Sequence, residues 1–252
     1  MVHFVGAGCG AADLITLRGK RLIENADVVI YAGSLVSAEL LDYAKKDCEI
    51  HNSAYMTLDE VIAVMQKAES EGKDTVRLHT GDPSIFGAIR EQIDRLEALG
   101  IGCDVCPGVS SFCGAAAALR AEYTLPGVSQ TVILTRMEGR TPVPPTESIE
   151  SLSAHRASMA IFLSAGMLGE LSERLINGGW KPDSPAAIVY KATWADEKVC
   201  RCTVSELAET AEINGIKKTA LILVGDFLDS GYELSKLYDP VFETGFRKAK
   251  EK

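Results

Sequence analysis

The chain has 252 residues, of which 46% are hydrophobic and 24% are charged. This balance is typical of a soluble globular protein with one large or two smaller domains, and it excludes global disorder. The formal net charge of −9, without a basic run, argues against binding to a nucleic acid backbone. No apolar run approaches the roughly 20 residues that span a bilayer, and residues 1–25 lack a secretory signal. We therefore expect a cytoplasmic protein with no nucleic acid or membrane partner.

The first half of the chain alternates between short apolar strands and helices. Strands are predicted at His3–Val5, Val28–Tyr31, Thr75–His79 and Cys103–Cys106, and helices over Leu14–Asn25, from Thr57 onward, over Ile85–Leu99 and up to Leu119. Thr57 and Glu60 have the spacing of a capping box at a helix start. Alternation of this kind predicts a mostly parallel sheet with helices on both faces.

The segment Tyr123–Gly127 interrupts the alternation, which places the predicted boundary between an N-terminal α/β domain (1–122) and a C-terminal α/β domain (123–252). Further strands are predicted at Thr131–Thr135, Met159–Leu163, Ala187–Tyr190, Val199–Thr203 and Thr219–Val224, and helices at Glu147–Ala154, Leu168–Asn177 and Ser205–Ile213. Because Val199–Thr203 follows a strand after a short turn, the second sheet is expected to be mixed. From Asp226 onward we expect a peripheral tail.

Three loops at strand ends have ligand-binding composition. The glycines of residues 6–10 suggest a dinucleotide loop, but no acidic residue follows the second strand at Tyr31 to hold a ribose. Residues 80–87 follow a buried strand at the edge where α/β proteins bind ligands, and Asp82 there either contacts a ligand or caps the next helix. The hydroxyls of Ser110 and Ser111 have the same two interpretations.

The seven cysteines are an odd number, which favours free thiols in a cytosolic chain. Cys103 and Cys106 have the spacing of a metal or redox pair. Residues three apart in a strand point to opposite faces, so the two thiols should diverge. We therefore predict no bound metal and no disulfide.

Several strings, taken together, resemble the tetrapyrrole methyltransferase family over nearly the whole chain. Those general to the family are Phe4-Val-Gly-Ala-Gly-Cys9 and Arg77-Leu-His-Thr-Gly-Asp-Pro-Ser-Ile-Phe-Gly-Ala88. Three others are similar to the branch that methylates carbon C-11 of a corrin precursor: Tyr31-Ala-Gly-Ser-Leu-Val36, Glu122-Tyr-Thr-Leu-Pro126 and Glu138-Gly-Arg-Thr-Pro142.

The resemblance implies two α/β domains of the class III S-adenosylmethionine-dependent type, a homodimer, and a ligand cleft between the domains. It implies S-adenosylmethionine as methyl donor and a tetrapyrrole as acceptor, without a protein-bound metal. By position, the donor contacts fall on Cys9, Thr80, Gly81, Asp82, Ile85, Ser110, Ser111, Leu163, Ala192 and Ala220. No residue is assigned as a catalytic acid or base.

The acceptor carries many carboxylates, so an acidic protein needs a local basic patch to bind it. Arg136 and Arg140 flank a strand end and a proline-rich loop, and we expect them to contact the substrate. Ala32 stands where relatives that methylate uroporphyrinogen carry an aspartate, which favours a different tetrapyrrole. The alternatives are a methylase of another ring position, a ribosomal RNA or protein methylase of the same superfamily, a nucleotide-binding oxidoreductase, and a non-catalytic binding protein. The acidic charge and the missing basic run weigh against an RNA substrate.

Overall fold

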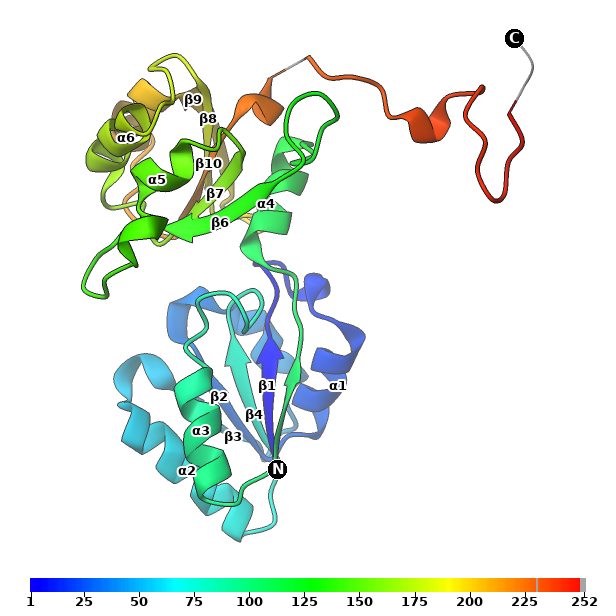
Figure 1. The fold of residues 1–252 in the computed structure, drawn as a ribbon. Coiled ribbons are helices and arrows are strands. Elements are labelled where there is room, and N and C mark those ends of the chain that lie inside the picture. The colour runs from blue at the N-terminus through cyan, green and yellow to red at the C-terminus, as the bar shows by residue number, and fades with distance from the viewer. Residues whose placement is uncertain (230, 250–252) are drawn as a thin grey trace. The chain divides into compact units, whose positions relative to one another are not determined.

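The computed structural model describes residues 1–229 and 231–249 (Figure 1). By its internal contacts the chain divides into two compact units. Unit 1 consists of Met1–Ala118 together with Lys191–Lys198, and unit 2 consists of Leu119–Tyr190 together with the chain from Val199 onward. Each unit is built on one five-stranded sheet. In the described part of the chain, no helix has both the length and the apolarity needed to cross a membrane.

Unit 1 is a parallel α/β unit. Its elements are β1 (Val2–Gly6), α1 (Leu17–Asn25), β2 (Val28–Tyr31), β3 (Glu49–Asn52), α2 (Leu58–Ser70), β4 (Thr75–His79), α3 (Arg90–Ala98), β5 (Cys103–Cys106) and α4 (Ser111–Leu119), the last of which ends on the first residue of unit 2. The strand order is β3-β2-β4-β1-β5, and all neighbouring strands are parallel, as predicted.

Alternate residues of these strands pack on opposite faces of the sheet, which gives unit 1 two apolar layers. Val28 and Ile30 pack with α2 and α3 on one face, whereas Val29 packs with Ile23 of α1 on the other. Figure 1 shows α1 on one side of the sheet, and α2 and α3 on the other. The burial of both faces explains why β2, Val-Val-Ile-Tyr, is apolar throughout.

Two predicted helices begin later than expected. Residues 12–14 form a 3-10 turn, and α1 starts at Leu17 after Thr16, whose hydroxyl accepts a hydrogen bond from the Gly19 amide at 3.0 Å. The helix predicted from Ile85 starts only at Arg90, because Phe86 and Ala88 have φ angles of 54° and 49° that no right-handed helix contains. Strand β3 was not predicted, since its sequence is polar and half exposed.

Unit 2 contains a mixed sheet, as predicted. Its elements are β6 (Val132–Arg136), α5 (Ile149–Ser153), β7 (Ser158–Phe162), α6 (Leu168–Asn177), β8 (Pro185–Tyr190), β9 (Lys198–Thr203), α7 (Leu207–Ile213) and β10 (Ala220–Val224). The order is β6-β7-β10-β8-β9, with β6 and β7 parallel and β10 antiparallel to both of its neighbours.

The core of unit 2 continues further along the chain than the sequence suggested. Leu171 and Leu175 of α6 are fully buried in the same cluster as Ile161 and Ile222 of the sheet. Phe227 and Leu228 are also buried, so the tail predicted from Asp226 begins only after them. Most side chains of residues 231–249 are exposed.

Candidate ligand-binding site

Three loops of unit 1 meet where β1, β4 and β5 end. Gly8 and Gly81 exchange two backbone hydrogen bonds, of 3.2 Å and 2.8 Å, which join the loop after β1 to the loop after β4. The amide of Gly108, in the loop after β5, donates to Oδ2 of Asp82 at 2.9 Å. The three loops therefore form one structure at the carboxyl edge of the sheet, where α/β proteins bind ligands.

Glycine is needed in these loops because their main chains nearly touch. A Cβ on Gly108 would lie 2.3 Å from the carbonyl oxygen of Gly81 and 2.7 Å from the Cα of Gly6. Gly81 itself has φ of 63°, and a Cβ there would be no nearer than 3.4 Å to Ser110. Glycine at these positions therefore lets the loops pack closely. Gly81, which has no side chain, also leaves its main chain uncovered.

Asp82 braces the loops and does not cap α3. Its Oδ1 accepts hydrogen bonds from the amide, at 2.9 Å, and the hydroxyl of Ser84, while Oδ2 accepts from Gly108. Burial alone would raise the pKa of Asp82, but these hydrogen bonds outweigh it and lower the pKa. Helix α3 begins at Arg90 with Ile89 in the N-cap position, so the capping interpretation of Asp82 was wrong.

The other predicted residues of unit 1 surround these loops. The hydroxyl of Thr80 donates to the Leu35 carbonyl at 3.0 Å, which connects the loop after β4 to the segment after β2. Ser110 is buried, and its carbonyl accepts from the amides of Cys113 and Gly114 at the start of α4. Ser111, which follows Ser110, and Ile85, which lies in the loop after β4, are both half-buried.

A segment from far along the chain completes this arrangement. Lys191–Lys198 packs with unit 1, where the Thr193 hydroxyl accepts from the Ala11 amide at 3.0 Å and lies 3.5 Å from Sγ of the buried Cys9. A Cβ on Gly10 would lie 2.6 Å from the carbonyl oxygen of Ala192. Thr193 carried no signal in the sequence, since its contacts span more than 180 positions.

The remaining predicted residues gather at one edge of the sheet of unit 2. Leu163 directly follows β7, has φ of 53°, and exposes 67% of its surface although it is apolar. Because Ile222 pairs with Ile161 in antiparallel register, Ala220 lies at the same edge as Leu163. Arg136 also ends there, since it pairs with Phe162 in the parallel ladder of β6 and β7.

The two predicted substrate arginines have different environments. The Arg136 guanidinium donates to the carbonyls of Met137, Thr141 and Pro142 at 3.0–3.1 Å, so it holds the loop that carries Arg140. Arg140 is exposed. Arg140 is therefore open to a ligand, whereas Arg136 positions the loop around it.

The seven cysteines are free thiols in the structure. Cys103 packs on the α2 and α3 face of the sheet and Cys106 on the α1 face, which confirms that their side chains diverge. Within residues 1–229 and 231–249, no group of three or more His, Cys, Asp or Glu side chains has a geometry suited to a metal ion.

Comparison with known proteins gives consistent matches. A family model described as Tetrapyrrole (Corrin/Porphyrin) Methylases matches residues 1–208. The cobalt-precorrin-4 C(11)-methyltransferase of Methanocaldococcus jannaschii is 54% identical over 252 residues, which cover 100% of this chain and 97% of that protein. The precorrin-4 C(11)-methyltransferase of Sinorhizobium sp is 46% identical over 248 residues, with 98% of each chain covered.

Solved structures match the fold of the chain as well. A crystal structure of a cobalt precorrin-4 methyltransferase matches with a TM-score of 0.88 and 47% identity, over 90% of this chain and 95% of the other. A uroporphyrin-III C-methyl transferase from Thermus thermophilus, complexed with S-adenyl homocysteine, matches with a TM-score of 0.74 and 25% identity, over 90% and 92% of the two chains. This chain belongs to the tetrapyrrole (corrin/porphyrin) methylase family.

Proposed function

We propose that the chain transfers a methyl group from S-adenosylmethionine to carbon C-11 of precorrin-4 or cobalt-precorrin-4 in cobalamin biosynthesis. The observation that carries this proposal is the identity of 46–54%, over 98–100% of the chain, to relatives named for that reaction. The uroporphyrinogen-III C-methyltransferase of Bacillus subtilis is only 28% identical. Methylation of another ring position is the alternative.

The loops of unit 1 suit the methyl donor. Gly81 leaves its main chain uncovered at the carboxyl edge of the sheet, and both oxygens of Asp82 are already engaged within the loops. Recognition of the donor in unit 1 therefore rests on main-chain groups and small side chains held in place by Asp82, Thr80 and Gly108. In unit 2, the exposed Leu163 and the half-buried Ala220 stay predicted donor contacts on the family resemblance.

The donor supplies an activated methyl group on a sulfonium, which is a good leaving group. The chain therefore needs to provide neither a nucleophile nor a metal ion for the transfer. Its residues have to hold the acceptor carbon in line with the methyl group and exclude water, and positioning of this kind is worth roughly 7–11 kcal/mol. The tightly packed loops around Gly81 and Gly108 give the rigidity that such positioning requires.

The carboxylates of the acceptor need cationic partners in a chain with a net charge of −9. The exposed guanidinium of Arg140 suits this role, because its fork of N–H groups binds a carboxylate through two hydrogen bonds. Arg136 contributes indirectly by holding the loop through three backbone carbonyls. We also propose, from the family resemblance, that the protein acts in the cytoplasm as a homodimer.

The experiment that tests the function compares three acceptors. The purified chain is incubated with methyl-labelled S-adenosylmethionine and one of the three acceptors: precorrin-4, cobalt-precorrin-4 or uroporphyrinogen III. The masses of the products are then measured by mass spectrometry. We expect one added methyl group on precorrin-4 or its cobalt form, and none on uroporphyrinogen III. Methylation of uroporphyrinogen III alone would instead favour the alternative, and transfer to none of them would contradict both proposals.

A further inference from the structure

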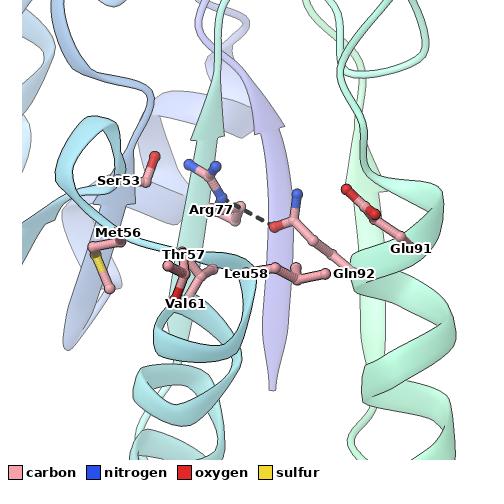
Figure 2. A pocket seen from close by; sticks show the side chains of 8 residues that line it. All are labelled: Ser53, Met56, Thr57, Leu58, Val61, Arg77, Glu91 and Gln92. Carbon is pink, nitrogen blue, oxygen red and sulfur yellow. Dashed lines mark hydrogen bonds between the residues drawn. The ribbon is translucent and has the colours of Figure 1, made fainter. Parts of the chain in front are cut away.

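We propose that unit 1 contains a second ligand site, a pocket that binds a small carboxylate at the buried guanidinium of Arg77. The pocket has a volume of about 160 Å³ and opens between α2 and α3 above β4 (Figure 2). Its polar lining comes from Ser53, Thr57, Arg77, Glu91 and Gln92. None of the residues assigned to the methyl donor lines it, so the pocket is a separate site.

Arg77 is the observation on which this proposal stands. It lies on β4, the middle strand of the sheet, and exposes only 7% of its surface. Its Nε donates to Oε1 of Gln92 at 3.1 Å and its Nη1 donates to the Ile30 carbonyl at 3.3 Å. Both acceptors are neutral, and in the part of the chain described here no carboxylate forms an ion pair with this guanidinium. Nη2 has no partner there either.

A buried guanidinium without a counter-ion is costly, because burial removes the water that stabilises the charge. Burial alone lowers the pKa of Arg77 to about 10, and no acidic neighbour offsets it. The group still carries a proton at neutral pH. The fold therefore holds a positive charge at the pocket that a bound anion would neutralise.

The surroundings of Arg77 on β4 add no negative charge. Thr75 and His79 point to the same face of the strand, and Oγ1 of Thr75 and Nε2 of His79 have no hydrogen-bond partner. Burial, with a smaller contribution from the positive charge of Arg77, lowers the pKa of His79 to about 3. His79 is therefore neutral, and Arg77 is the only charge in this row.

Two helices begin at the pocket and favour an anion there. Thr57 is the N-cap of α2, and Gln92 lies in the first turn of α3, whose N-cap residue Ile89 offers no capping side chain. The positive ends of both helix dipoles are thus at the pocket. Of the nearby acids, Glu60 is held by the amide and hydroxyl of Thr57, at 2.6 Å and 2.9 Å. The exposed Glu91 lines the pocket and opposes an anion.

The size and lining of the pocket indicate the class of ligand. A volume of about 160 Å³ holds several heavy atoms, since a liquid water occupies about 30 Å³. The free N–H groups of a guanidinium fit a carboxylate, and the lining side chains of Met56, Leu58 and Val61 fit a short alkyl group. Propionate matches this combination, either as a free anion or as the side arm of a larger molecule.

The first test measures propionate binding directly. Isotopically labelled propionate is titrated against the full chain at constant ionic strength, and binding is followed by NMR of the ligand. We expect saturable binding to the wild type and at least tenfold weaker binding to Arg77→Gln. Absence of saturable binding to the wild type, or equal affinity in a folded Arg77→Gln variant, would overturn the proposal.

A second pair of variants keeps the test valid if Arg77→Gln does not fold. Glu91→Gln removes an exposed negative charge from the pocket, so it should tighten propionate binding roughly threefold or more. Glu97→Gln, on the same helix but outside the pocket, is the matched control and should bind as the wild type does. Equal affinities in both variants and the wild type would contradict the site.

Two further measurements address the source of the carboxylate. Chloride at the same ionic strength should displace propionate only weakly, because it cannot form the forked hydrogen bonds, and equal displacement would contradict a carboxylate site. Precorrin-4 that competes with propionate would identify the carboxylate as an arm of the tetrapyrrole. Simultaneous binding of both would identify a free anion. Because the readout is propionate binding, the test does not depend on the proposed methyl transfer.

Discussion

At the scale of single residues, Gly108 has no room for a side chain in the candidate site. An added Cβ would lie 2.3 Å from the Gly81 carbonyl oxygen, which is backbone and cannot rotate away. Gly108→Ala should therefore lower the free energy of unfolding by about 1–3 kcal/mol, as overpacking does. Gly139→Ala is the control, because a Cβ at Gly139 meets nothing within 4 Å and should change stability by less than about 0.5 kcal/mol. Chemical denaturation measures both, and equal stabilities would show that the loops can separate.

The two arginines of unit 2 should respond differently to substitution by lysine. Arg140→Lys keeps the charge but loses the fork, so KM for the tetrapyrrole should rise roughly 3- to 10-fold while donor affinity stays unchanged. Arg136→Lys also loses hydrogen bonds to three backbone carbonyls, so it should in addition loosen the loop from residue 137 to 142. Steady-state kinetics and hydrogen exchange of the loop separate the two effects. Normal kinetics in both variants would place the substrate patch elsewhere.

Local sequence patterns predicted the roles of some residues but not those of others. The capping box of Thr57 and Glu60 formed as predicted, because its two hydrogen bonds join residues three apart. Asp82 had two interpretations, and the sequence did not distinguish them because its partner Gly108 comes from another loop. The placement of Thr193 against Cys9 followed no local rule at all, since the chain folds back from another unit to make that contact.

At the scale of elements, β4 is the unusual strand, because a central strand of a sheet buried on both faces is normally apolar. His79 exposes only 5% of its surface, and burial lowers its pKa to about 3 from 6.5 in the unfolded chain. Between these two pH values, His79 binds a proton in the unfolded state but not in the folded state. The contribution of neutral His79 to the free energy of unfolding is therefore complete above about pH 6.5. It falls as the pH decreases below that value, by up to about 1.4 kcal/mol per pH unit.

His79→Phe should reduce this loss of stability in acid, because phenylalanine keeps the ring and has no proton to gain. The measurement is the free energy of unfolding by urea from pH 7 to pH 4.5, and the slope should be smaller in the variant than in the wild type. His155→Gln is the control for the loss of a histidine, since His155 is exposed. Parallel slopes for His79→Phe and the wild type would show that His79 takes up its proton without unfolding.

Strands were easier to predict than helix starts. Buried apolar runs such as β2 and the amphipathic α6 were predicted with the observed bounds, because their hydrophobic periodicity is set by the core. The start of α3 was missed by several residues, since the left-handed residues Phe86 and Ala88 are neither glycine nor asparagine and carry no turn signal. Strand β3 was missed because it is short, polar and at the edge of the sheet.

At the scale of the whole molecule, the return of Lys191–Lys198 to unit 1 means that neither unit is one continuous stretch of chain. We propose that the boundary between the two domains lies, along the chain, between residues 122 and 123. A fragment of residues 1–122 lacks Thr193, whose hydroxyl accepts a hydrogen bond from the Ala11 amide and contacts Cys9. The alternation of strands and helices predicted both sheets but not this exchange, because periodicity reports local structure and not the path of a connecting segment.

We propose that the chain methylates one ring carbon, C-11, of precorrin-4 or cobalt-precorrin-4. Placing one carbon in line with the methyl group, and no other, depends on differences of about an ångström, which change the rate by roughly 10²-fold. The most direct measurement is carbon NMR of the product formed with an isotopically labelled methyl donor. We expect a single labelled methyl group, bonded to C-11. A labelled methyl group on any other ring carbon would contradict the assigned reaction.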